Sequence, residues 1–281
     1  NKGTWRGQRT INLNKHMTEG MRFRNKLAYD LIRGIPQMVG LRTQFVHLYV
    51  KDNTEESGVK FEDYGIYTQV EQLNKTALKS HGLDSNGQLY KINSFEFYRY
   101  EDIIKKEDDA GYDKTAFEKM LEIKGDSDHT KLIDMLTDLN DYSIGIEDVL
   151  KEHFDEENIV YWMAFQILMG NVDTQNRNVY LYSPLNSDIW YFIAWDNDGC
   201  LMRPEYELRN FSDQNSWEKG ISNYWGNILF QRCLKSRSFR EKLNDAILDL
   251  REYLNKDMLT SKIESYKNCL LYTSPSPRDC S

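Results

Sequence analysis

The chain has 281 residues, of which 40% are hydrophobic and 28% charged, with a formal net charge of −8. This composition is typical of a globular protein, and the length fits one bilobal unit or two small domains. The acidic charge argues against a general nucleic-acid binder, because phosphate contacts need clustered Lys and Arg, and it favours basic peptides as partners. No segment approaches the roughly 20 apolar residues of a membrane helix.

The first part of the chain is predicted to form a small sheet that carries one helix. An amphipathic helix is predicted over residues 21–33, and a charged hairpin loop is predicted over residues 51–63. We place the end of this small lobe, residues 1–99, near residues 98–102, where the composition becomes highly charged. The strands are predicted at residues 10–14, 45–50, 64–70 and 89–97.

The rest of the chain, residues 100–268, is predicted to form a larger helical lobe. A surface linker is expected at residues 101–114. Residues 157–169 are apolar on nearly every face, which predicts a helix buried inside the lobe, with Gly170 as its C-terminal stop. Two strands rich in β-branched and aromatic residues follow, at residues 178–183 and 188–195, joined by a turn. The predicted order is helix, polar loop, hairpin and acidic turn.

Three polar residues occupy that loop and that turn. Asp173 is separated from Asn178 by four residues, and Asp196 follows the hairpin. In protein kinases an Asp accepts the proton of the substrate hydroxyl, an Asn with this spacing holds magnesium, and a second Asp beyond a hairpin binds the metals. Magnesium needs hard oxygen ligands, and the nucleophile needs a separate carboxylate. The pattern therefore predicts the metal and phosphate end of a phosphotransferase site.

The sequence also departs from the kinase pattern. Residues 171–172 are Asn-Val where protein kinases usually have His-Arg, and residues 197–199 are Asn-Asp-Gly in place of Phe-Gly. These departures exclude a typical protein kinase and allow an atypical one.

Several stretches of the sequence resemble one known family. They are GNVDTQNRN followed by WDND, the upstream stretches RFRNKLAYDLIR, YGIYTQVEQLNK and GQLYK, and the downstream stretch NILFQRCLKSRSFREKL. Together these stretches resemble the CotH family of kinase-like proteins, and the resemblance covers Gly3 to Leu259. It implies an α+β, bilobal, protein-kinase-like fold in which a small β-rich lobe lies over a larger helical lobe. ATP and magnesium would bind between the two lobes.

The resemblance implies an atypical protein kinase that transfers the γ-phosphate of ATP to Ser or Thr of a protein. We expect the substrate to be basic and Ser-rich, and the family suggests a cell-surface, secreted or spore-coat location. By resemblance, Asp173 would be the catalytic Asp, and Asn178 and Asp196 the metal ligands. Asp198 is an additional candidate ligand.

Three charged residues of the small lobe are candidates for contacts with ATP. Arg9 stands where the family often has a basic residue that faces the phosphates. Glu71 is a candidate to pair with that base or to orient a metal, and Lys91 a candidate to reach a phosphate. The alternative for each is a solvated charge at a strand end.

Other interpretations stay open. An isolated Asp or Asn in a loop is usually a cap or turn residue. The acidic turn could be a calcium loop, since Gly199 and Glu205 have the required spacing, but Ala194 then occupies the first ligand position.

The function of the chain could also differ from that of a kinase on the same fold. A non-catalytic surface or adhesin-like binding protein is one alternative, and a nucleotidyl or other group transferase is another.

The ends of the chain are expected to be artificial. The sequence begins with Asn1, and CLLYTSPSPRD near the C-terminus matches an in-frame translation of a sequencing adapter. We therefore expect a fragment, of the kind obtained by environmental sequencing, with a non-native tail over residues 269–281.

Overall fold

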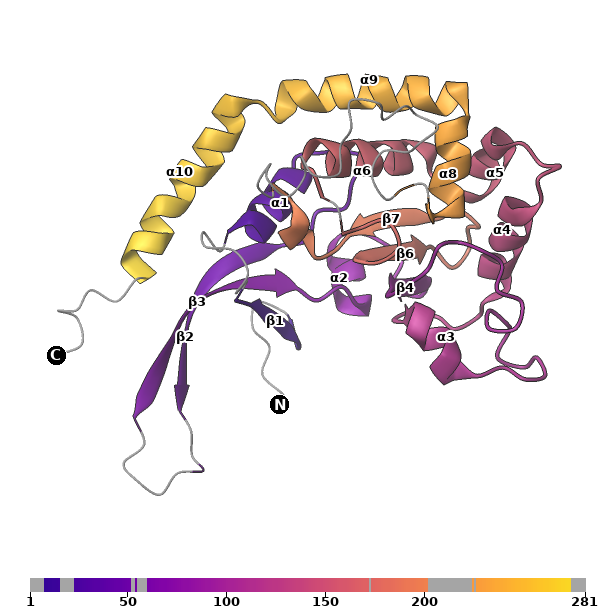
Figure 1. Ribbon diagram of the computed structural model, residues 1–281. Helices are drawn as coiled ribbons and strands as arrows, with labels where there is room; N and C mark the ends of the chain where they lie inside the picture. Colours follow the sequence, from indigo (N-terminus) through magenta and orange to yellow (C-terminus); the bar gives the residue numbers. More distant parts are fainter. Residues whose placement is uncertain are drawn as a thin grey trace.

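The computed structural model describes residues 8–15, 23–51, 54, 60–171, 173–201, 224 and 226–273, with side chains up to residue 267. Within these ranges the chain has a mixed α+β fold, in which a small antiparallel sheet near the N-terminus adjoins a larger helical region (Figure 1). This is the kinase-like bilobal arrangement, and it confirms the predicted fold class.

The small sheet has three antiparallel strands in the order β1-β3-β2. They are β1 (Ile11–Asn14), β2 (Thr43–Lys51) and β3 (Phe61–Glu71). The predicted hairpin of the second and third strands is confirmed, with a register shift between Leu48 and Tyr49. The strands continue past their predicted ends, because cross-strand pairing carries the ladder into residues that are too polar to be recognised by pattern alone. Figure 1 shows the β2–β3 hairpin projecting from the body of the molecule.

A second sheet has four antiparallel strands in the order β5-β4-β6-β7. They are β4 (Gln88–Ile92), β5 (Leu121–Ile123), β6 (Val179–Ser183) and β7 (Tyr191–Ala194). The hairpin predicted after the polar loop is therefore confirmed. The expectation that the strand beginning near residue 89 joins the small sheet is wrong, since β4 pairs with β5 and β6 and ends at Ile92. An apolar run shows that a strand is buried but does not identify its partner. The lobe boundary at residues 98–102 stays a prediction.

The predicted central helix is confirmed as α6 (Glu156–Leu168), with Gly170 in the left-handed conformation (φ 58°) just after it. Its side chains Trp162, Met163 and Phe165 are fully buried. Helix α9 packs along one side of α6 and β7 along another (Figure 1). The described helices are α1 (Arg24–Ile32), α2 (Lys75–Ser80), α3 (Lys114–Met120), α4 (Thr130–Asn140), α5 (Ile146–His153), α6, α8 (Ile228–Lys235), α9 (Arg237–Tyr253) and α10 (Lys256–Thr273).

Aromatic packing holds α6 rigidly in place. The ring of Trp162 lies 5.1 Å from that of Phe192 on β7 and 5.5 Å from that of Phe230 on α8, measured between centroids. Such contacts add to the energy of burial and fix the helix against the hairpin. The loop that leaves the C-terminal end of α6 therefore starts from a fixed position. No helix within the described ranges is long and apolar enough to cross a membrane.

Candidate functional site

The polar loop after α6 is fastened to that helix by Asn171. The Asn171 side chain is buried, and its Nδ2 donates to Oε1 of Gln166 on α6 over 2.9 Å. Its Oδ1 accepts a bond from the backbone N–H of Asp173 over 3.3 Å. Asn171 stands where typical kinases have His, so the departure seen in the sequence has a structural role here. It fixes the backbone that carries Asp173.

Asp173 and Asn178 are in direct contact. Nδ2 of Asn178 donates to the backbone oxygen of Asp173 and to its Oδ2, both over 3.0 Å. Asn178 adopts a left-handed conformation (φ 56°), which Asn tolerates better than most residues. Arg177 donates from Nε to Oδ1 of Asp173 over 2.6 Å. Since the Asn178 amide nitrogen is used by Asp173, its Oδ1 is the atom left to serve as a ligand.

Helix α1 holds the acidic turn after β7. Asp196 is left-handed (φ 52°, ψ 71°), and its backbone N–H donates to the hydroxyl of Tyr29 over 2.9 Å. The next backbone N–H, of Asn197, donates to Oδ1 of Asn25 over 2.9 Å. Asn25 and Tyr29 are both buried and lie one turn apart on α1. Two side chains of α1 therefore hold a strained turn by accepting hydrogen bonds from two consecutive backbone N–H groups.

The acidic turn and the polar loop touch at Gly199. A Cβ atom at this position would lie 2.6 Å from Oδ1 of Asn171 and 3.5 Å from Cβ of Asp173. Only a glycine fits without displacing Asn171. The residues around Asp173 and Asp196, which are 23 positions apart in the sequence, are therefore packed against each other.

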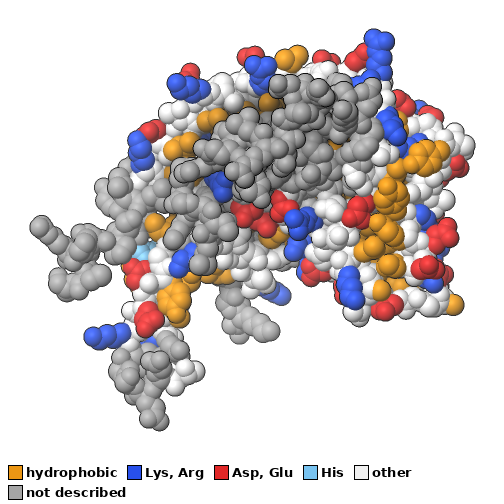
Figure 2. Space-filling view, in the orientation of Figure 1, with side chains coloured by type: hydrophobic (Ala, Val, Ile, Leu, Met, Phe, Trp, Pro, Cys, Tyr) orange, Lys and Arg blue, Asp and Glu red, His pale blue; other side chains and the backbone are white. Residues whose placement is uncertain are grey.

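The electrostatics of Asp196 show which charges surround it. Its burial raises the pKa of the carboxyl, the charges of Asp198 and then Asp173 raise it further, and Lys91 opposes them, so that the pKa is about 6. Like charges destabilise one another in such a position, and a cation would stabilise the ionised form. On the face shown in Figure 2, acidic and basic side chains lie together near the centre, where Figure 1 shows the end of β7.

The donor set suits magnesium. The carboxylates of Asp173, Asp196 and Asp198 and the amide oxygen of Asn178 are hard ligands, the type that magnesium prefers. In the described part of the chain, no group of three or more His, Cys, Asp or Glu side chains is arranged to hold a metal ion. Magnesium is usually bound by one or two carboxylates together with substrate phosphates, and its binding by these residues stays a prediction.

The three residues expected to contact ATP from the small lobe have different settings, and Lys91 lies on a strand of the second sheet. Arg9 is exposed on the segment before β1, and Lys91 on β4 acts on the charge of Asp196. Glu71 is fully buried at the end of β3 and bonds to Arg42 over 2.9 Å and to His81 over 2.8 Å. Burial raises the pKa of Glu71, but the bonds from His81 and Arg42 lower it more, to about 2. Contact of these residues with ATP stays a prediction.

Sequence reasoning missed several residues of this site. Arg177 lies four positions after Asp173, a spacing that could have been noticed. Asn25 and Tyr29 are polar positions on the buried side of an otherwise apolar helix face, which is a weaker signal. Arg42 and His81 meet Glu71 only through the fold, and no local pattern predicts their meeting.

A family model described as CotH kinase protein matches residues 1–272. The chain therefore belongs to the CotH kinase protein family, as its motifs predicted. It is 24% identical over 241 residues to the inner spore coat protein H of Bacillus subtilis (strain 168). The alignment covers 85% of this chain and 61% of that relative, so the chain spans about three fifths of the relative's length.

Proposed function

We propose that this protein is an atypical protein kinase that uses ATP and magnesium to phosphorylate Ser or Thr of a protein. The observation that carries the proposal is the packing of the Asp196 turn against the loop that joins Asp173 to Asn178, with Gly199 at the point of contact. Family membership supports a kinase-like function, and the site supplies the residue types that phosphoryl transfer requires.

Each residue has a defined task in this proposal. Asp173 accepts the proton of the substrate hydroxyl while that oxygen bonds to the γ-phosphorus and the bond to the β-phosphate oxygen breaks. Arg177 and Asn178 hold the two oxygens of the Asp173 carboxylate and orient it. Asp196 and Oδ1 of Asn178 would hold magnesium, which supplies positive charge to the phosphates. Catalysis of this kind is mostly positioning and charge neutralisation.

The inner spore coat name of the relative guides the choice of substrate. We propose that this chain acts on proteins of a spore coat or cell surface. Its acidic net charge favours substrates that are basic and rich in Ser.

The test is incubation with magnesium, a basic Ser-rich protein and ATP labelled either at the γ- or at the α-phosphate. Transfer of γ-label alone, lost in Asp173→Asn, is the expected result. Transfer of α-label would identify a nucleotidyl transferase instead. No transfer from either ATP would favour a binding protein on the kinase fold. Asp134→Asn is a matched control, because Asp134 is an exposed acid on α4 that lies on none of the elements of the site.

A further inference from the structure

Two cavities lie at the first turn of α6, at the opposite end of that helix from the loop that carries Asp173. One, of about 510 Å³, is bounded by the segments before β2 and after α2, the start of α6, and the outer end of the β6–β7 hairpin. The other, of about 600 Å³, lies between α6 and α9. Glu157 lines both, so the first turn of α6 borders both cavities.

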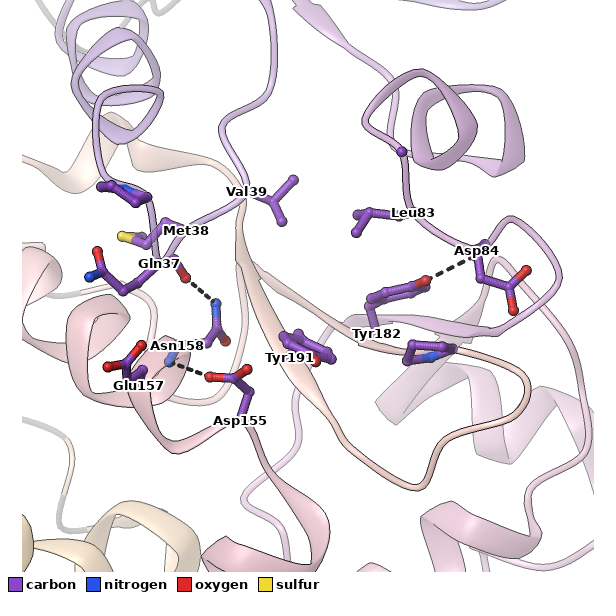
Figure 3. A pocket seen from close by; sticks show the side chains of 13 residues that line it. Gln37, Met38, Val39, Leu83, Asp84, Asp155, Glu157, Asn158, Tyr182 and Tyr191 are labelled. Atoms are coloured by element: carbon purple, nitrogen blue, oxygen red, sulfur yellow. Dashed lines mark hydrogen bonds between the residues drawn. The ribbon is translucent and has the colours of Figure 1, made fainter.

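The first cavity combines apolar walls with acidic ends. In Figure 3, Asp84 lies at one end of the group, and Asp155 and Glu157 lie at the other. No Lys or Arg is among the described residues that line it. The hydroxyl of Tyr182 donates to the backbone oxygen of Asp84, which fixes one wall against that end. Apolar and aromatic side chains of the lining include Met38, Val39, Leu83, Tyr182 and Tyr191.

The second cavity is acidic as well. Lys242 is the basic residue of its described lining, and it pairs with Glu156 over 2.5 Å. The Asp249 carboxylate accepts a bond from the hydroxyl of Tyr161 over 2.8 Å. By contrast, the side chains of Glu157 and Asp245 make no hydrogen bond or ion pair with another described residue. Two exposed carboxylates are therefore available to an external cation.

Helix stability does not explain the two acids that α9 contributes, Asp245 and Asp249. Asp245 and Asp249 are four residues apart on α9, and like charges at this spacing destabilise a helix. Asp249 also lies one turn from the C-terminal end of α9, where the helix dipole favours positive charge. Other acids of the two cavities have structural roles. Asp155 caps α6 by accepting the backbone N–H of Asn158, and the Asp84 carboxylate accepts the backbone N–H groups of Asn86 and Leu185. Asp249 is offset by its bond from Tyr161, but the cost at Asp245 has no local gain beside it, which indicates a role in binding for that carboxylate.

We propose that the two cavities form one docking surface for an extended Lys- or Arg-rich segment of the protein substrate. The long aliphatic parts of such side chains would pack on the apolar and aromatic walls, while the charged groups reach the carboxylates at the ends. Charge complementarity selects this occupant, since the lining is acidic in both cavities. The proposal rests on the proposed kinase function and adds a second contact with the substrate.

The location of the surface sets the geometry of the substrate. Helix α6 has 13 residues, so its two ends are about 20 Å apart at 1.5 Å per residue. An extended chain covers this distance in about six residues. The phosphorylated Ser or Thr therefore lies at least about six residues from the docked basic segment.

The binding test uses the full chain and a fluorescein-labelled ten-residue peptide of alternating Arg and Leu, which contains no Ser or Thr. Binding is measured by fluorescence anisotropy at low and at high salt. We expect Glu157→Gln and Asp245→Asn each to weaken binding about two- to fivefold, and the double variant about tenfold or more. High salt should reduce the difference between the wild type and the variants.

Matched controls are Glu152→Gln on α5 and Asp134→Asn on α4, which neutralise exposed acids outside both cavities. They should change binding less than twofold. Equal weakening by the control variants would show that the affinity for the peptide depends only on the net charge of the protein, and would overturn the proposal. Unchanged binding in the double variant would overturn it as well.

The peptide cannot be phosphorylated, so the result does not depend on transfer. If the γ-label experiment fails and the docking variants still weaken peptide binding, the kinase proposal is wrong and the docking surface stands as a peptide-binding site. If transfer occurs and the docking variants bind the peptide normally, the docking proposal alone is wrong. A peptide series with one Ser placed two to ten residues from the basic segment then measures the spacing. Better phosphorylation at the shorter spacings would contradict the location.

Discussion

Replacing Tyr29 by Phe should loosen the turn that carries Asp196. The Tyr29 hydroxyl accepts a hydrogen bond from the backbone N–H of Asp196, and Tyr29 is 1% exposed. Asp196 adopts a left-handed conformation that costs a non-glycine residue about 1–2 kcal/mol. The hydrogen bond from Tyr29 helps to hold it there. Loss of the hydroxyl leaves the N–H unpaired with no compensating gain, because Phe keeps the packing.

The expected loss of unfolding free energy is about 1–2 kcal/mol, at the lower end of the range for an unpaired buried donor, since the site is partly buried. For a protein of this size the melting temperature should fall by about 2–4 °C for each kcal/mol. If the turn then populates other conformations, the apparent affinity for ATP with magnesium falls in proportion to the fraction of molecules that keep the competent turn. Binding becomes tenfold weaker, a loss of about 1.4 kcal/mol in binding free energy, when only about one molecule in ten keeps the competent turn.

The assay combines thermal unfolding with calorimetric titration of ATP and magnesium. Tyr90→Phe is the matched control, because the Tyr90 hydroxyl is also buried and bonds to Nδ1 of His129 over 2.7 Å, away from the acidic turn. We expect both variants to lose stability, and only Tyr29→Phe to bind ATP more weakly. Equal effects on ATP binding, or a destabilised Tyr29→Phe protein with normal affinity, would refute the role of α1 in holding the turn.

Three further changes test other parts of the site. Asp196→Asn should weaken calorimetric binding of ATP with magnesium, whereas Asp173→Asn should leave binding largely intact and abolish transfer; equal binding losses would contradict this division of roles. Gly199→Ala should lower the free energy of urea unfolding by about 1–3 kcal/mol, because its Cβ would lie 2.6 Å from Oδ1 of Asn171. The pKa of Glu71 falls from 4.5 to about 2, so its ionisation stabilises the fold above pH 4.5 by at most about 3 kcal/mol. That stability is lost as the pH falls towards 2. In Glu71→Gln, the melting temperature should therefore fall less between pH 4.5 and pH 2 than it does in the wild type.

Local sequence patterns predicted the elements around the site. The apolar run of α6 and its glycine stop gave the helix within one residue at each end. The β-branched and aromatic runs after Asn178 gave the hairpin of β6 and β7. These features depend on periodicity and turn residues, which act over a few positions and are therefore visible in the sequence. The motifs also identified the family, which the match over residues 1–272 confirms.

The partners of these elements could not be predicted in the same way. Strand β4 was recognised as a strand, but the choice between two sheets depends on packing across the whole chain. Glu71 was noticed as a charge at the end of a strand, and its bonds to Arg42 and His81 join positions 29 and 10 residues away.

The sequence by itself determined the order of helix, loop, hairpin and turn, and the residue types that phosphoryl transfer needs, because both are properties of short segments. Only the tertiary structure decided that α1 holds the turn at Asp196, that Gly199 packs against Asp173, and that acids from α6, α9 and distant loops line adjoining cavities. Contacts between distant residues depend on how elements pack, and many packings are compatible with the same local pattern.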